Sequence, residues 1–402
     1  MATGVDTALS GRQLADRLVE AGTVLLDTAD AGESGRAGFL FEKPVGELVA
    51  SGIEDVVPAL EAVDRVIGEG LWVAGFISYE AGYAFEKSLL GTEVNGPLLW
   101  FGVYDRAARL APGAVGEGLS AAAGGRSVVE AFRPGVEQGD YRRNVWIIRN
   151  HIREGDVYQI NYTFPLLFEF RGDSLALYRD LRLAQPVPYA AYINDGRSIH
   201  LSMSPELFFE RRRSSIVTRP MKGTAPAGRT PDADAEVSAL LQADAKNRAE
   251  NLMIVDLLRN DLSRCCRPGS VKVPALFTVH RYPTVLQMTS TVEGTLREDA
   301  GYASIFRALF PCGSVTGAPK IKAMEIIREL EPAARGVYCG AIGFISPHRE
   351  ATFSVAIRTV SLDRWSGRMG TGSGVVWDSD PSAELEECLL KTRFLREATG
   401  ER

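Results

Sequence analysis

The sequence predicts an α+β fold built mainly from antiparallel sheets. Segments with strand character outnumber the simple strand–helix–strand alternations that would build a doubly wound parallel sheet. The chain has 402 residues, 45% of them hydrophobic and 24% charged, and it shows no internal repeat of fixed period. A chain of this size and composition can bury a large core, in one unit or in two to three domains.

Residues 1–110 are expected to form an N-terminal subdomain of mixed elements. A polar helix is predicted around Leu14–Ala21, where apolar positions recur with helical spacing. Short apolar runs rich in β-branched and aromatic residues predict strands at Thr23–Leu26 and Leu71–Ser78.

A flexible connection and a denser domain follow. Residues 111–127 are rich in Gly and Ala with little periodicity, so we expect a flexible connection over 111–137 and a catalytic domain over 138–396. Helical and strand-like periodicities in that domain predict helices at Tyr141–Glu154, Asp244–Asn260, Ile321–Leu330 and Ala383–Arg396, and strands at Val157–Phe170, Ile199–Phe209, Gly340–Ile345, Ala351–Leu362 and Gly374–Trp377. The apolar stripe expected for the longest helix comprises Ala249, Leu252, Met253 and Leu257.

The charge pattern argues against a nucleic-acid-binding protein. The net charge is −6, only four His are present, and no basic face stands out. If the ligand is an anion, a few aimed cations or a metal ion must supply local positive charge. Five Cys without C-x-x-C spacing fit reduced thiols in the cytoplasm, and neither a leader after Met1 nor a membrane segment is expected.

Two glycine-rich stretches suggest backbone contacts to a ligand. Gly313–Lys320 has Pro319 where a phosphate loop requires Gly-Lys, and Gly370–Val375 lacks the third glycine of a dinucleotide fingerprint. Glycines also let backbone N–H groups approach a carboxylate closely. For Gly370–Val375, a plain hairpin without a ligand is an equally good interpretation.

Three carboxylates on two predicted helices form a candidate metal site. Glu384 and Glu387 lie three residues apart on one helix face, and Glu250 projects from the helix that begins near Lys246. Mg²⁺ prefers one or two protein carboxylates together with water and an anionic substrate. A solvated helix face is the alternative for each Glu taken singly.

Several longer motifs follow one another in a fixed order. They are Ser204-Pro-Glu206, Thr218-Arg-Pro-Met-Lys222-Gly-Thr224, the segment Asp244–Asp261, Ser314-Val-Thr316-Gly-Ala-Pro-Lys320 and Ile357-Arg358-Thr359. In this order they resemble the chorismate-utilising enzymes, a family that includes anthranilate, aminodeoxychorismate, isochorismate and salicylate synthases. The resemblance covers residues 138–395 and, more loosely, Val24–Asp27 and Gly75–Gly82. It implies the anthranilate synthase component I-like fold, in which two mainly antiparallel sheets pack together with helices outside.

The resemblance implies roles for individual residues. Glu250 and Glu387 would hold Mg²⁺, with Glu384 as a direct or water-mediated ligand, and the ion would hold the ring carboxylate of chorismate. Glu206 would be the general acid for the departing C4 hydroxyl, which requires a raised pKa; an exposed Glu at a strand end is the alternative. Residues expected to contact the enolpyruvyl carboxylate, line the site or place a cation near the metal are Arg358, Tyr338, Gly372, Gly374, Thr316 and Lys391.

Gln159, Lys222 and Gln287 separate the branches of this family. Water-adding members carry a Lys base where this chain has Gln159, and a neutral amide cannot abstract a proton. Lys222 resembles the 4-aminating members, whereas 2-aminating members carry Ala there; a surface Lys after a turn is the alternative. The 4-aminating route implies that a neutral Lys222 amine attacks C2 before ammonia attacks C4. Gln287 stands in place of a frequent His and can still donate a hydrogen bond.

The resemblance also implies a partner. None of the five Cys lies in a Gly-x-Cys-x-Gly nucleophile turn, so ammonia would come from a separate class I glutamine amidotransferase subunit. Without a lyase domain, the expected product is 4-amino-4-deoxychorismate. Two rivals stay open: a 2-aminating relative, and a non-catalytic chorismate-binding paralogue.

Overall fold

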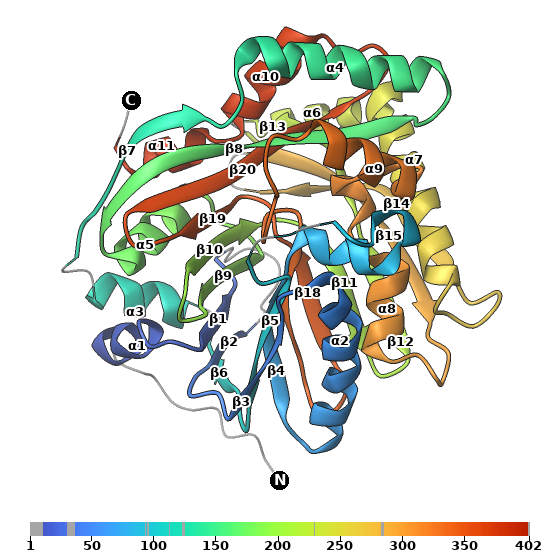
Figure 1. Ribbon diagram of the computed structural model, residues 1–402. Helices are drawn as coiled ribbons and strands as arrows, with labels where there is room; N and C mark the ends of the chain where they lie inside the picture. The colour runs from blue at the N-terminus through green and yellow to red at the C-terminus, as the bar shows by residue number, and fades with distance from the viewer. Residues whose placement is uncertain are drawn as a thin grey trace.

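The computed structural model describes residues 11–29, 37–92, 94, 96–111, 113–122, 125–228, 230–282 and 285–400. Within these residues the strands form two ten-stranded sheets, and every strand pair is antiparallel. Helices lie outside these sheets (Figure 1). The predicted α+β fold with two antiparallel sheets is therefore confirmed.

The first sheet contains strands from both ends of the chain. In spatial order it comprises β16 (Gly317–Ala318), β8 (Gln159–Gly172), β20 (Ser366–Val375), β19 (Thr359–Leu362), β10 (Ile199–Ser204), β9 (Tyr189–Asn194), β1 (Thr23–Asp27), β2 (Gly38–Phe41) and β6 (Ala108–Leu110), and β7 (Ser127–Pro134) also pairs with β8.

The second sheet is mixed in the same way. In spatial order it comprises β13 (Met221–Pro226), β15 (Val285–Thr295), β12 (Ser215–Arg219), β11 (Leu207–Arg212), β18 (Ala351–Val355), β17 (Ala341–Ile345), β4 (Trp72–Ile77), β5 (Leu99–Tyr104) and β3 (Gly46–Ala50), and β14 (Lys272–Arg281) also pairs with β15.

Helices cover the outer faces of the sheets (Figure 1). The α-helices are α1 (Gly11–Leu18), α2 (Ile53–Gly68), α3 (Ala114–Ala122), α4 (Gln138–Arg153), α5 (Ser174–Ala184), α6 (Pro231–Ala243), α7 (Ala245–Ser263), α8 (Tyr302–Leu309), α9 (Lys320–Leu330), α10 (Pro381–Leu390) and α11 (Arg393–Ala398). Short 3₁₀ helices are η1 (Tyr79–Phe85), η2 (Lys87–Leu89) and η3 (Gly313–Val315). None of the helices in the described ranges is long and apolar enough to cross a bilayer.

An aromatic layer joins the two sheets. Phe41 of β2 contacts Tyr104 of β5 with ring centroids 5.3 Å apart, and Phe76 of β4 lies 6.2 Å from Trp100. These side chains are at most 3% exposed, and they form one core with apolar residues of β1, β9 and β17. Burial of aromatic surface of this size fixes the mutual position of the sheets.

The chain changes sheets at two neighbouring points. The predicted single strand Ile199–Phe209 is in fact β10 in the first sheet and β11 in the second, and Ala351–Leu362 is likewise β18 and β19. Pro205 lies at the first break and cannot donate a ladder hydrogen bond. Arg358, with φ of 52°, lies at the second break, and its carbonyl accepts a 3.1 Å hydrogen bond from the N–H of Met203.

The predicted connection carries regular structure. Within residues 111–137, of which 112, 123 and 124 are outside the described ranges, the chain forms α3 and β7. Gly and Ala composition indicated flexibility, but Leu119 and Val129 are buried in the core that covers the first sheet. The division into residues 1–110, 111–137 and 138–396 stays a prediction, although strands from both sides of the connection share both sheets. The N-terminal residues 1–10, where no leader was expected, lie outside the described ranges.

The long helix α7 buries a different face from the one predicted. Leu252 is 44% exposed, whereas Ile254, Val255 and Leu258 are about 1% exposed. The face with Ile254, Val255 and Leu258 is the buried one because it also carries Asn251. This residue is fully buried and accepts a 2.6 Å hydrogen bond from the Ser290 hydroxyl in β15. The predicted final helix is likewise two helices, α10 and α11, which break at residues 391–392.

Candidate functional site

Gly374, Gln159 and Lys222 meet where the two sheets approach each other. A Cβ on Gly374 would overlap the side-chain amide of Gln159 and would lie 3.7 Å from Nζ of Lys222. Gly374 and Gln159 belong to the first sheet, in β20 and β8, and Lys222 belongs to β13 of the second. Gly370–Val375 lies within the long strand β20 and is not a hairpin turn, and at Gly374 the missing side chain leaves space for two polar groups.

Lys222 is partly buried among charged groups. Burial lowers the pKa of its ammonium group, and the Lys391 cation lowers it further, while the carboxylates of Glu250, Glu206 and Glu387 act in the opposite direction. Glu250 comes from α7 and Glu206 from the break between β10 and β11. Glu387 comes from α10, and Lys391 follows the last residue of that helix. The structure therefore gathers four predicted site residues around the Lys222 amine, whose neutral form is favoured by burial.

Glu206 is buried at the first break between the sheets. It is 4% exposed, and its Oε1 has no hydrogen-bond partner among the described residues. Burial raises the pKa of this carboxyl to about 7, against the lowering effects of the Ser314 hydroxyl, the Lys222 charge and the Met221 N–H. Its backbone is fixed because its carbonyl accepts a 3.1 Å hydrogen bond from the N–H of Val355. Such a carboxyl can donate a proton near neutral pH.

Thr316 and Gln159 lie on segments that touch each other. The Thr316 hydroxyl donates to the Cys312 carbonyl at 3.1 Å, and the Thr316 carbonyl accepts from the N–H of Asn161 at 2.7 Å. The hydroxyl of this fully buried residue is thus engaged within its own turn. Gln159 is 2% exposed, and its Oε1 lacks a partner in the described part of the chain.

Two capped helices present the predicted metal carboxylates. The Asp244 side chain accepts from the N–H of Asn247 at 2.7 Å and starts α7, which carries Glu250. The Asp380 side chain accepts from two backbone N–H groups, with Pro381 in the first turn, and starts α10. Asp at this position satisfies backbone N–H groups that a helix leaves unpaired.

The three predicted metal carboxylates do not form one cluster. Glu384 accepts a 2.6 Å hydrogen bond from the Ser379 hydroxyl, and Glu387 pairs with Lys391 at 2.7 Å. Lys391 also donates to the Gly372 carbonyl at 2.9 Å. In the described ranges no group of three or more His, Cys, Asp or Glu is arranged to hold a metal ion. The charges of Glu250 and Glu387 both act on the Lys222 ammonium group.

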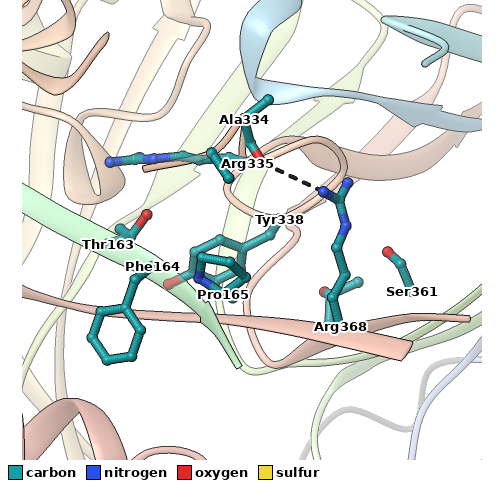
Figure 2. Close-up of a pocket in the computed structure, with 11 residues that line it drawn as sticks. Thr163, Phe164, Pro165, Ala334, Arg335, Tyr338, Ser361 and Arg368 are labelled. Atoms are coloured by element: carbon teal, nitrogen blue, oxygen red, sulfur yellow. Dashed lines mark hydrogen bonds between the residues drawn. The ribbon is translucent and has the colours of Figure 1, made fainter. Parts of the chain in front are cut away.

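Arg358 and Tyr338 line two different pockets. The Arg358 pocket is also lined by Pro205, Tyr282 and Gln287. The Tyr338 pocket, shown in Figure 2, is lined by residues of β8, β19, β20 and the loop before Tyr338, which are Thr163, Phe164, Pro165, Ala333, Ala334, Arg335, Thr359, Ser361, Arg368 and Gly370. In the described part of the chain, the two predicted carboxylate-binding side chains therefore line separate pockets. Burial lowers the pKa of Arg358, and the Tyr282 side chain opposes this effect.

Gln287 is held in a defined orientation. It is 5% exposed, and its Oε1 accepts a 3.0 Å hydrogen bond from the Thr224 hydroxyl. The acceptor oxygen is therefore occupied, and the amide N–H₂ group is left as a donor. The orienting role of Gln287 stays a prediction.

Ser314 is a site residue that the sequence interpretation missed. Its hydroxyl is close enough to the Glu206 carboxyl to lower the pKa of that group, and it lies 3.3 Å from the Cys312 sulfur. Ser314 stands in the same motif as Thr316, but a single serine carries no sequence signal for a contact across about a hundred residues of chain. Only its position in a motif shared with a predicted site residue could have indicated it.

Comparisons with known proteins identify the family of this chain. The family model described as chorismate binding enzyme matches residues 33–397. Aminodeoxychorismate synthase component 1 of Klebsiella aerogenes is 41% identical over 267 residues, which cover 66% of this chain and 59% of that protein. Anthranilate synthase component 1 of Streptomyces coelicolor is 39% identical over 295 residues, which cover 72% of this chain and 58% of that protein. The chain thus matches less than two thirds of the length of these relatives.

A solved structure gives the same result for the fold. Anthranilate synthase component I from Streptococcus pneumoniae superposes with a TM-score of 0.77 at 25% identity, over 91% of this chain and 93% of that one. Its agreement extends over both sheets, and the family match includes every predicted site residue. This chain belongs to the family of chorismate binding enzymes.

Proposed function

We propose that this chain aminates chorismate at C4 to give 4-amino-4-deoxychorismate, the reaction of an aminodeoxychorismate synthase component 1. The observation that carries the proposal is the position of Lys222, whose amine lies beside Gly374 and the Glu206 carboxyl. A relative that is named for this activity is 41% identical. A non-catalytic paralogue would have no reason to keep an amine with lowered pKa beside a buried acid with raised pKa.

The first half of the reaction is a displacement by Lys222. Its neutral amine forms a bond to C2 of the ring, the two ring double bonds shift, and the C4–O bond breaks. Glu206 donates its proton to the departing hydroxyl, which leaves as water. The nitrogen of Lys222 then releases one proton to the Glu206 carboxylate, so charge and atoms balance across the step.

The second half reverses the electron shift. Ammonia attacks C4, the double bonds shift back, and the C2–N bond to Lys222 breaks. The proton lost by ammonia is taken up by the departing Lys222 amine. Two displacements leave the configuration at C4 unchanged and return Lys222 to its starting state.

The donor set around Lys222 fits Mg²⁺. Glu250 and Glu387 come from separate helices and act on the same amine, and Mg²⁺ needs only one or two protein carboxylates when a substrate anion and water complete its shell. When bound, the ion would neutralise the ring carboxylate of chorismate. Glu384, which is engaged by Ser379, would act through water.

The remaining predicted residues would bind and orient the substrate. Arg358 would meet the enolpyruvyl carboxylate with its planar guanidinium group, together with the backbone at Gly372 and Gly374. Tyr338 lines the other pocket, so it would contact this carboxylate only if the two pockets join when substrate binds. Gln287 would donate a hydrogen bond from its amide N–H₂ group, while its Oε1 accepts from Thr224. Lys391 would add positive charge next to Glu387, and Thr316 and Gln159 would line the ring.

Ammonia would come from a separate glutamine amidotransferase subunit in the cytoplasm. The word component in the name of the Klebsiella relative supports a two-subunit arrangement for that protein. Free ammonia at high concentration would replace the partner because the proposed attack at C4 requires only the neutral amine.

The runner-up is amination at C2, the reaction implied for the anthranilate synthase relative. Its 39% identity is close to that of the 4-aminating relative. The choice between them depends on Lys222, since an enzyme that adds ammonia directly to C2 has no use for a protein amine at the same carbon.

Product identification tests this proposal. The protein is incubated with chorismate, Mg²⁺ and ammonium, and the products are analysed by mass spectrometry before and after addition of an aminodeoxychorismate lyase. We expect a product that the lyase converts to p-aminobenzoate. Anthranilate as the main product would overturn the proposal in favour of the runner-up.

A further inference from the structure

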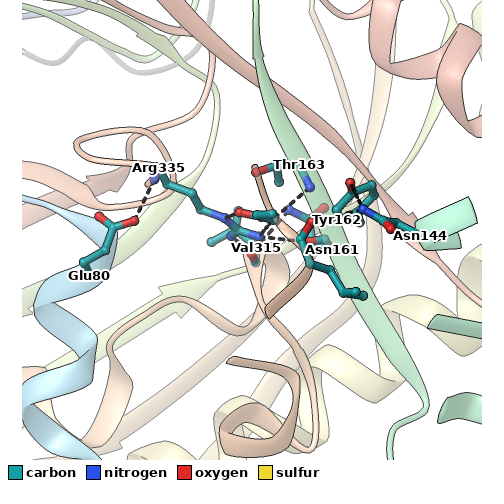
Figure 3. A network of polar contacts seen from close by, with 9 residues as sticks. Glu80, Asn144, Asn161, Tyr162, Thr163, Val315 and Arg335 are labelled. Carbon is teal, nitrogen blue, oxygen red and sulfur yellow. Dashed lines mark hydrogen bonds and ion pairs between the residues drawn. The ribbon is translucent and has the colours of Figure 1, made fainter. Parts of the chain in front are cut away.

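We propose that Arg335 is a positioning residue that, with Tyr79, Glu80 and Glu331, holds three site-lining segments in register. These four residues are called the Arg335 clamp below. The inference rests on the proposed function, because it assigns a catalytic consequence to the positions of those segments. Figure 3 shows two members of the clamp, Arg335 and Glu80, together with Val315, Asn161 and Thr163 of the segments that the clamp holds.

The Arg335 guanidinium group is fully engaged on one side by Glu331. Its Nε and one terminal nitrogen donate to the two Glu331 oxygens at 2.8 and 2.6 Å. The two side chains are 2% and 5% exposed. A bidentate pair that is this deeply buried has a single geometry, because any displacement leaves a charge unpaired without water.

The other side of the same group reaches backbone carbonyls. The terminal nitrogens donate to the Val315 carbonyl at 2.6 Å and to the Asn161 carbonyl at 2.7 Å. Glu331 adds a third backbone contact by accepting from the N–H of Thr163 at 2.8 Å. Arg335 therefore ties the 3₁₀ turn η3 to strand β8 through its own side chain.

Tyr79 and Glu80 fix the backbone of Arg335 itself. The two Glu80 oxygens accept from the N–H groups of Arg335 and Gly336 at 2.6 and 3.0 Å. The N–H of Tyr79 donates to the Gly336 carbonyl at 2.8 Å, and the Arg335 guanidinium lies 4.2 Å from the centre of the Tyr79 ring. The Gly75–Gly82 motif, which the proposed reaction does not use, thus contributes two members of the clamp.

The segments held by the clamp carry proposed site residues. Val315 stands between Ser314, which contacts Glu206, and Thr316. Asn161 lies two residues after Gln159, and its N–H and side-chain amide both bond to η3, at 2.7 Å to Thr316 and 3.3 Å to Val315. Tyr338 follows Arg335 in the same loop and lines the same pocket (Figure 2).

Shape, and not only charge, explains why an Arg is required. Lys has one point charge on a flexible stem and cannot contact two carboxylate oxygens and two carbonyls at once. Arg335→Lys is therefore expected to keep the ion pair but to release η3 and β8 from each other. The proposed acid Glu206 would then lose its fixed relation to Ser314.

The test compares Arg335→Lys with two matched controls. Arg393→Lys changes another Arg that pairs with a Glu four residues away, but on the surface at 2.6 Å. Arg182→Lys changes a partly buried Arg that pairs with the buried Asp27 at 2.6 Å on a remote part of the first sheet. The second control reports the cost of disturbing an ion pair with a buried carboxylate without touching the site.

We expect kcat of the ammonia-dependent reaction to fall about 100-fold in Arg335→Lys, which is the size of effect that a displacement of about 1 Å produces. The pH at which kcat declines should also move, because Glu206 loses its fixed position beside the Ser314 hydroxyl, which affects its pKa. Arg393→Lys and Arg182→Lys should keep kcat within about twofold. A loss in Arg182→Lys as large as that in Arg335→Lys, at equal melting temperature, would overturn the inference.

Hydrogen–deuterium exchange gives a readout that does not need activity. If Arg335→Lys does not fold, Glu80→Gln replaces it in this experiment, because that variant keeps Arg335 and removes one charge of the clamp. In either variant the amides of Asn161 and Thr163 should exchange at least about tenfold faster, and in Arg182→Lys they should not. Unchanged exchange at both amides contradicts the clamp, whereas a wild-type protein without C4 amination contradicts the proposed function alone.

Discussion

The Nζ of Lys222 lies 3.7 Å from the point that a side-chain carbon of Gly374 would occupy. This relationship joins two motifs that are about 150 residues apart and that belong to different sheets. It requires glycine at residue 374, because any larger residue would overlap Gln159 and crowd the amine. The proposed nucleophile and the glycine-rich strand thus form one site.

Replacement of Lys222 by Ala should abolish 4-amination. Loss of the nucleophile removes the covalent route, so the rate should fall at least about 1,000-fold, while chorismate still quenches intrinsic fluorescence on binding. Lys272→Ala, at an exposed position of β14, is the matched control and should retain wild-type turnover. Wild-type turnover in Lys222→Ala would exclude the covalent mechanism.

The rate should depend on pH through Glu206. The pKa of this carboxyl is raised to about 7 by burial, and the proposed acid must be protonated, so kcat/KM should decline as pH rises above about 7. Protonation of Lys222 should limit the rate on the acid side, at a pH below the ordinary lysine range because its pKa is lowered. A stopped assay from pH 5 to 10 measures both limbs, and a rate that still rises between pH 8 and 9 would argue against Glu206 as the acid.

Glu206 should also make the protein less stable at high pH. Its folded-state pKa of about 7 lies above the ordinary value of 4.5, so the folded state binds more protons between these values and stability falls as pH rises through this window. The difference corresponds to about 3 kcal/mol. Between pH 4 and pH 8, the free energy of unfolding in urea should therefore fall by about this much more in the wild type than in Glu206→Gln. Parallel curves for the two proteins would contradict a buried, neutral Glu206.

The metal dependence should separate the three helix carboxylates. Glu387→Gln and Glu250→Gln should raise the Mg²⁺ concentration for half-maximal activity about tenfold or more, and Glu384→Gln should have a smaller effect because Ser379 engages its carboxylate. Glu386→Gln, at an exposed neighbour on α10, is the control. Addition of EDTA should stop the reaction, and equal Mg²⁺ requirements in all four variants would remove α7 and α10 from the proposed metal site.

Local patterns predicted much of the architecture. Strand and helix periodicities anticipated β8 and α9 to within a few residues, and the long motifs identified the family and its two sheets. The sheet changes at Pro205 and Arg358 were not predictable, because an apolar strand pattern does not reveal which sheet it joins. The buried face of α7 was missed because two apolar stripes compete there, and the choice depends on contacts of Asn251.

The candidate site was predictable for motif residues whose expected chemistry follows from their residue type. Lys222 and Glu206 were expected to have shifted pKa values, and burial shifts both in the expected directions. The effect of Ser314 on Glu206 and the hydrogen bond from Arg335 to the Val315 carbonyl join residues that are far apart in the sequence. No local pattern encodes such contacts. The Glu387–Lys391 pair, in contrast, joins residues four apart at the end of one helix, a spacing that the sequence does contain.

Trapping of the covalent intermediate tests the central claim most directly. The protein is mixed with chorismate and Mg²⁺ without ammonia, quenched at intervals, and examined by intact-mass and peptide mass spectrometry. We predict a mass gain equal to chorismate less one water, located on Lys222 and absent in Lys222→Ala. A protein that turns over when ammonia is supplied, yet carries no adduct at any time or carries it on another residue, would contradict the account.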